Sequence, residues 1–110
     1  MQLQPETHAQ LAGRPLAAKG GIDGLVTSAA ATYAARGIRV NAIAPGPIWT
    51  PLIPASFDAE RVASHGSKAP LGRAGQPNEV APAALFLACE DGSYFTGQTL
   101  HPNGGTLVGG

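Results

Sequence analysis

The sequence has few residues that could cross-link it or bind a metal. Cys89 is the only cysteine in 110 residues, so neither an intramolecular disulfide nor a cysteine-based zinc site can form. The three histidines, His8, His65 and His101, are too scattered to indicate a metal site, and no metal is expected. Charged residues make up only 13% of the chain, which suggests that part of its surface is covered by another protein surface.

The sequence also lacks an excess of charge of either sign. Seven basic residues balance seven acidic ones, and no basic run indicates a nucleic-acid partner or an anionic membrane surface. There is no apolar run of about 18 residues that could span a membrane, and no hydrophobic segment typical of a secretory signal follows Met1. These absences predict a cytoplasmic protein that binds neither nucleic acid nor membrane.

The clearest predicted element is a helix from Pro15 to Arg36. Proline suits a first helical position because its missing N–H has no partner there, and Gly37 suits the left-handed residue after a helix end. The segment 1–14 has little periodicity and is predicted to be irregular, so the domain is placed at 15–110. One apolar stripe follows the helical repeat, formed by Ile22, Leu25, Val26, Ala29, Ala30 and Tyr33.

A strand, a long loop, a helix and a short strand are expected in the rest of the chain. The apolar run Ile38–Ala44 predicts a buried strand, which the segment Pro45-Gly46-Pro47 ends. Residues 48–74 form a loop long enough to be a functional lid, with a short helix near 55–64. A second helix is predicted to begin at Pro77, with Glu79 in its first turn, and a short strand covers Gln98–His101.

Four linked motifs resemble the C-terminal half of short-chain dehydrogenases/reductases. They are Lys19–Leu25 (KGGIDGL), Gly37–Thr50 (GIRVNAIAPGPIWT), Pro70–Ala81 with its Pro-Leu-Gly-Arg and Gln-Pro-Asn-Glu-Val-Ala runs, and Phe95–Gly105 (FTGQTLHPNGG). The resemblance covers roughly residues 16–107. It implies an α/β fold, here a partial Rossmann-like unit of long helix, strand, lid loop, helix and short strand, completed by oligomerisation.

The resemblance also implies a chemistry and a set of site residues. Members of the family transfer a hydride between NAD or NADP and a carbonyl or alcohol substrate. In the family, a tyrosine is the general acid/base, and a lysine four residues later lowers its pKa and holds the nicotinamide ribose. Lys19 matches that lysine, and Pro45, Gly46, Ile48 and Thr50 match the turn that touches the cofactor. Trp49, in the same turn, is read as lid or interface packing.

The sequence departs from the family at two decisive places. Pro15 stands four residues before Lys19, where the family has its tyrosine, and proline has no proton to transfer. No Gly-rich phosphate loop between a strand and a helix occurs in the 110 residues. Weak or absent cofactor binding is therefore expected, and the chain alone is predicted to be inactive or impaired. The sequence names no substrate and does not distinguish NAD from NADP.

Two further functions stay open at this point. The strand expected on the other side of Ile38–Ala44 is missing, which leaves unpaired backbone groups on an apolar strand. In the first alternative, the chain is a non-catalytic interaction module that forms homo-oligomers or pairs its strand with a protein partner. The lowest-ranked alternative is an unrelated hydrolase using Asp58, His65 and Ser67, which the absence of a Gly-x-Ser-x-Gly turn disfavours.

Overall fold

The computed structural model describes residues 15–108, with side chains from residue 21 onward. The predicted irregular segment 1–14 lies outside the described residues, and the assignment of one domain to 15–110 stays a prediction. No helix in the described part combines the length and hydrophobicity that crossing a bilayer requires. Among the described residues two compact units can be distinguished, the first comprising 15–42 and Glu90–Thr99 and the second Ile43–Cys89 and 100–108.

The first unit contains the long helix α2, Pro15–Tyr33, which continues as a 3₁₀ turn, Ala34–Arg36. Gly37 ends it in the left-handed conformation, with φ of 74°, and its N–H donates to the Ala34 carbonyl at 3.0 Å. Glycine adopts this conformation without the steric cost that a β-carbon brings. Both predicted ends of the helix are therefore confirmed, and only the last turn is tighter than an α-helix.

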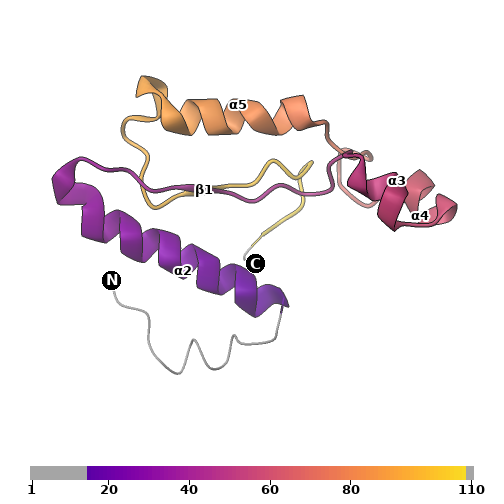
Figure 1. The fold of residues 1–110 in the computed structure, drawn as a ribbon, viewed down its shortest axis with the longest axis horizontal. Coiled ribbons are helices and arrows are strands. Elements are labelled where there is room, and N and C mark those ends of the chain that lie inside the picture. The colour runs from indigo at the N-terminus through magenta and orange to yellow at the C-terminus, as the bar shows by residue number, and fades with distance from the viewer. Residues whose placement is uncertain (1–14, 109–110) are drawn as a thin grey trace. The chain divides into compact units, whose positions relative to one another are not determined.

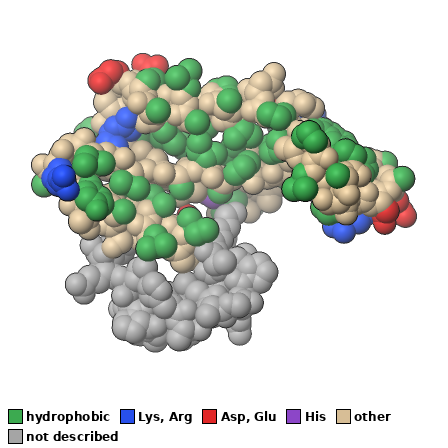
Figure 2. All heavy atoms as spheres, viewed as in Figure 1, with side chains coloured by type: hydrophobic (Ala, Val, Ile, Leu, Met, Phe, Trp, Pro, Cys, Tyr) green, Lys and Arg blue, Asp and Glu red, His purple; other side chains and the backbone are tan. Residues whose placement is uncertain are grey.

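Only part of the apolar stripe of helix α2 is buried among the described residues. Ala30 is buried, and Asp23 accepts a hydrogen bond from the Thr99 hydroxyl at 3.0 Å. Ile22 and Leu25 are 56% and 61% exposed, so this part of the apolar stripe does not belong to the core of the described residues. The segment that leads into β2 meets the helix at Ala30, where a β-carbon on Gly97 would lie 3.4 Å from the Ala30 Cβ. Hydrophobic side chains accordingly show on the surface over α2 (Figure 2).

The sheet has two parallel strands, β1, Ala42–Ile43, and β2, Thr99–Leu100 (Figure 1). Both are shorter than the predicted Ile38–Ala44 and Gln98–His101, although backbone hydrogen bonds extend beyond them. Among the described residues β1 has a partner on one side, so it stays half-buried and Ile38 is 43% exposed, which corrects the expectation of a buried strand. The bonds are Gly97 N to Val40 O, Ala42 N to Gln98 O, Ala44 N to Leu100 O and Gly46 N to Pro102 O.

Asn41 explains why a polar residue interrupts the apolar run before β1. Its Nδ2 donates to the Phe95 carbonyl at 2.9 Å, and its Oδ1 accepts from the Gln98 N–H at 3.0 Å. Both partners lie on the segment that leads into β2. The side-chain amide thus joins the two chain segments where backbone pairing begins, and the Thr96 hydroxyl adds a bond from the Val40 N–H at 3.1 Å.

The lid region of the second unit contains two short helices in place of the single one expected near 55–64. These are α3, Leu52–Ser56, and α4, Ala59–Ser64, which lie beside each other (Figure 1). Phe57 and Asp58 are extended and separate them. Asp58 is the N-cap of α4, because its Oδ1 accepts from the Arg61 N–H at 2.9 Å. An aspartate that caps a new helix cannot also continue the previous one.

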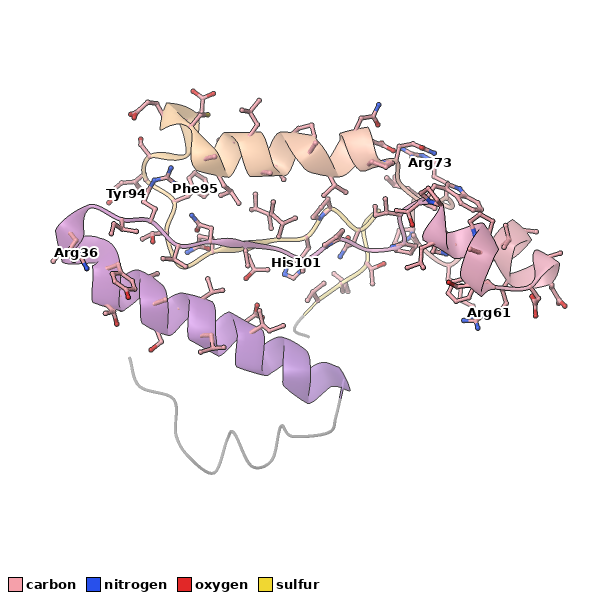
Figure 3. All side chains as sticks on the ribbon, in the orientation of Figure 1. Arg36, Arg61, Arg73, Tyr94, Phe95 and His101 are labelled. Carbon is pink, nitrogen blue, oxygen red and sulfur yellow. The ribbon has the colours of Figure 1, made fainter. Side chains whose placement is uncertain are left out.

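Helix α5, Pro77–Ala88, begins at the predicted proline. Glu79 stabilises its first turn, since Oε1 accepts from the Gln76 N–H at 2.9 Å and the carboxylate forms two hydrogen bonds with Arg73, at 2.8 and 2.9 Å. Arg73 lies at the N-terminal end of α5 (Figure 3). The bond from Arg73, followed by that from Gln76, lowers the pKa of Glu79 from 4.5 to about 2.

The lowered pKa of Glu79 predicts how stability changes in acid. Because the pKa is lowered in the folded state, the contribution of the carboxylate is fully present above pH 4.5 and is lost as the pH falls toward 2. We expect Glu79→Gln to lower the urea midpoint at neutral pH, and the difference from wild type to shrink as the pH falls through this window. Arg73→Gln should show the same narrowing. A difference that stayed constant down to the lowest pH would contradict the assignment.

Candidate functional site

The turn after β1, residues 45–50, is held by the segment that precedes α5. Gly75 donates its N–H to the Pro47 carbonyl at 2.9 Å, and its carbonyl accepts from the Trp49 N–H at 2.8 Å. Ile48 and Gly75 thereby form a parallel bridge. A β-carbon at position 75 would lie 2.9 Å from Ile48 Cδ1, so the glycine lets the two segments approach. The turn that the resemblance assigns to the cofactor is thus ordered by contacts within the chain.

The other side of this turn contacts His65, which follows α4. The His65 Nε2 lies 3.3 Å from the Ile48 carbonyl oxygen. The rings of His65 and Trp49 meet edge to face, with centroids 5.3 Å apart and planes inclined by 70°. The indole of Trp49 therefore packs against a lid residue, and this contact does not involve a ligand.

Packing within the chain explains why position 46 is a glycine. Its N–H donates to the Pro102 carbonyl at 3.1 Å, and a β-carbon at this position would lie 2.8 Å from both the Cα and Cβ of Asn103. The close approach of the segment after β2 therefore requires glycine, whether or not a ligand binds. Pro45 is exposed, and the Thr50 carbonyl accepts from the Ile53 N–H at 3.1 Å at the start of α3.

We expect Gly46→Ala to lower the free energy of unfolding by about 1–3 kcal/mol, because the added methyl group must displace the backbone of Asn103. Urea unfolding followed by circular dichroism measures the effect. Gly21→Ala is the matched control, since a β-carbon there meets nothing within 4 Å and the residue lies in α2. It should stabilise the chain by up to about 1 kcal/mol. Equal effects of the two substitutions would refute the packing explanation.

A cavity of about 200 Å³ lies beside the turn in the second unit. Of the candidate cofactor residues whose side chains are described, Ile48 lines it. Arg73, the cationic side chain among its described lining residues, already binds the Glu79 carboxylate. Its lining is Pro47, Ile48, Leu71, Arg73, Gly75, Glu79, Val80, Pro102, Asn103 and Gly104.

The remaining predicted site residues divide into two groups. Lys19 lies in α2, four residues after Pro15, but its side chain is outside the described part of the chain. Asp58 and His65 are described, and both have other partners: Asp58 caps α4, and His65 contacts the Ile48 carbonyl. The structure therefore does not assemble the hydrolase arrangement with Ser67.

Two residues that hold the turn were missed from the sequence. Gly75 was not singled out in the sequence as a site residue, and His65 appeared only as a member of the hydrolase alternative. Neither has a local signal, because each acts on a segment more than fifteen positions away. A glycine separated by one residue from the helix-starting Pro77 could at most have suggested a close backbone approach.

Comparison with known proteins decides the family. Residues 11–106 match a sequence profile described as Enoyl-(Acyl carrier protein) reductase, which covers most of the chain. The chain belongs to the short-chain dehydrogenase/reductase family. It is 58% identical over 94 residues to a glucose and ribitol dehydrogenase homolog of Oryza sativa subsp. japonica, covering 86% of this chain and 31% of that protein. It is 59% identical over 93 residues to the chloroplastic NADPH-dependent aldehyde reductase 1 of Arabidopsis thaliana, covering 84% and 32%.

Solved structures of this family support the fold. A 3-oxoacyl-[acyl-carrier protein] reductase from Brucella melitensis superposes with a TM-score of 0.71 at 42% identity, over 79% of this chain and 32% of that one. A short-chain type dehydrogenase/reductase from Mycobacterium ulcerans gives a TM-score of 0.69 at 38% identity, over 79% and 32%. The chain thus spans about a third of the length of the relatives it matches, and has the α/β arrangement of the corresponding third.

Proposed function

We propose that this chain is an oxidoreductase-derived unit that presents the nicotinamide-facing turn of the family but does not turn over substrate alone. The observation that carries the proposal is the ordered turn 45–50. Its backbone is hydrogen-bonded to Gly75 on one side, contacts His65 on the other, and is joined to Pro102 at Gly46. A preformed turn loses little entropy on contact with a ligand, because its conformation is already fixed.

The absence of turnover follows from Pro15. A general acid/base must hold a transferable proton within hydrogen-bond reach of the substrate oxygen, and a proline side chain has none. Lys19 alone could orient a nicotinamide ribose without supplying that proton. Since the 110 residues contain no Gly-rich loop for the diphosphate, binding of NAD or NADP by this chain is proposed to be weak.

The substrate class proposed for the complete site is a carbonyl compound or the corresponding alcohol. The names of the relatives support this, since they include a glucose and ribitol dehydrogenase homolog and an NADPH-dependent aldehyde reductase. The described residues of this chain contribute the turn, and the contacts to the diphosphate and adenine would come from elsewhere.

An absorbance assay of NADPH oxidation tests the proposal. We expect no turnover above the blank with glyceraldehyde, and none in the reverse direction with ribitol and NAD or NADP. Pro15→Tyr should also be inactive, because the added phenol does not supply the missing phosphate contacts. Steady turnover by the unmodified chain would overturn the proposal, since it would require another proton donor.

A second candidate function is that of an interaction module, and exposed surface favours it. Ile22 and Leu25 leave more than half of their surface open on α2, and each strand of the sheet has one edge unpaired within the described residues. Apolar helix faces and open strand edges promote association. We propose that the chain forms homo-oligomers or pairs with a second polypeptide through this surface.

Sedimentation velocity tests the second candidate. We expect the chain to sediment as a dimer or larger species, and Ile22→Lys with Leu25→Lys to shift it toward monomer. Tyr94→Lys is a control for added charge, because Tyr94 is 99% exposed on a different segment. A well-folded monomer at all concentrations would rule out self-association.

A further inference from the structure

The peptide group between Ile48 and Trp49 is bound at both of its polar atoms. Its carbonyl oxygen belongs to Ile48 and lies 3.3 Å from His65 Nε2, and its N–H belongs to Trp49 and donates to the Gly75 carbonyl at 2.8 Å. Gly75 precedes α5, whereas His65 follows α4. Two separate segments therefore hold one peptide plane of the candidate turn.

The chemistry of the two groups fixes the direction of the His65 contact. A carbonyl oxygen can only accept a hydrogen bond, so the His65 Nε2 must carry the hydrogen. Neutral His65 is then the Nε2–H tautomer. The edge-to-face contact with the Trp49 indole orients the imidazole ring, with ring centroids 5.3 Å apart.

A second aromatic ring of the lid, Phe57, also lies near the imidazole. The Phe57 ring lies 6.4 Å from the His65 ring, and the Arg61 guanidinium stacks 4.2 Å above Phe57. Arg61 projects from α4 (Figure 3). Gly66 then packs against the backbone of Ala74. His65 is consequently held by both neighbours in space and by the next residue in the chain.

We propose that His65 is a positioning residue that fixes the Ile48–Trp49 peptide and thereby couples the lid helix α4 to the nicotinamide-facing turn. It acts through the Ile48 carbonyl and not on a substrate or cofactor atom. The role of the turn toward nicotinamide rests on the proposed function above, whereas the coupling itself does not. Release of His65 frees the carbonyl end of the peptide while Gly75 still holds the N–H end.

Two variants of His65 distinguish the effect of its hydrogen-bond donor from the effect of its aromatic ring. His65→Phe keeps an aromatic ring beside Trp49 and removes the donor, and His65→Gln keeps an N–H donor of similar reach and removes the ring. Hydrogen–deuterium exchange, read at residues 48–50 and 59–64, should accelerate about fivefold in His65→Phe, as the loss of one hydrogen bond predicts. His65→Gln should stay within about twofold of wild type. Ser67→Ala, an exposed neighbour, controls for changes in the loop.

A second measurement does not depend on the variants folding. Long-range ¹H–¹⁵N correlation spectra of the wild-type chain report the imidazole tautomer, and we expect Nε2–H for neutral His65. Unchanged exchange in His65→Phe, equal acceleration in both variants, or an Nδ1–H tautomer would each overturn the proposal. All of these readouts are made without cofactor. Cofactor titrations leave them unaffected, so tight binding of NADH or NADPH would count against the proposed function alone.

Discussion

We expect Gly66→Ala to lower the free energy of unfolding by about 2–5 kcal/mol. Gly66 has a φ of +82°, where a β-carbon costs about 1–2 kcal/mol. That carbon would also lie 2.5 Å from Ala74 Cα and 2.7 Å from the Arg73 carbonyl carbon, and overpacking adds about 1–3 kcal/mol. Ala74 is buried, so its backbone cannot move freely.

Gly72→Ala is the control for the conformational part of this effect. Gly72 has a similar φ of +77°, but a β-carbon there meets nothing within 4 Å. Its substitution should cost only about 1–2 kcal/mol. Urea unfolding of both variants gives the difference, which is the cost of forcing the lid away from the segment before α5. Equal losses would mean that Gly66 is needed only for its backbone angles.

The second large effect is a gain in stability from Pro82→Ala. Pro82 lies inside α5, where it removes the N–H that would bond the Asn78 carbonyl and crowds that carbonyl with its ring. It is exposed, so its replacement removes no buried contact. We expect the free energy of unfolding to rise by about 2–3 kcal/mol, measured by urea denaturation.

Pro77→Ala is the matched control for Pro82→Ala. Pro77 is the first residue of the same helix, where an N–H would have no partner in the helix. Its replacement should change stability little or lower it slightly. A gain from Pro77→Ala as large as that from Pro82→Ala would show that the position within the helix is not the cause.

The helices could be predicted from the sequence because their ends are local chemistry. Pro15 and Pro77 suit first helical positions, and Gly37 suits the left-handed residue after a helix. The structure has both helices at those limits. The split of the lid into α3 and α4 could not be foreseen from apolar spacing, because it depends on which N–H the Asp58 carboxylate accepts from.

The lengths of the strands and the contacts of the turn could not be predicted from the sequence, because they depend on residues that are distant in the chain. Strand length is set by how many neighbours pair with it, and β1 has one within the described residues, so its regular part is shorter than its apolar run. The motifs identified Gly46 and Ile48 as candidate site residues. They could not reveal that Asn103 approaches Gly46 or that His65 reaches the Ile48 carbonyl, because no spacing rule connects such positions.

The central claim is that this chain carries the nicotinamide-facing turn without the rest of the dinucleotide site. Fluorescence of Trp49, the only tryptophan, reports directly on that turn during titration with NADH, NADPH and reduced nicotinamide mononucleotide. We expect all three to bind equally weakly, with dissociation constants near or above about 1 mM, because the adenine end finds no contacts. Saturation by NADH or NADPH near about 1 μM, with much weaker binding of the mononucleotide, would contradict the account by revealing a complete dinucleotide site.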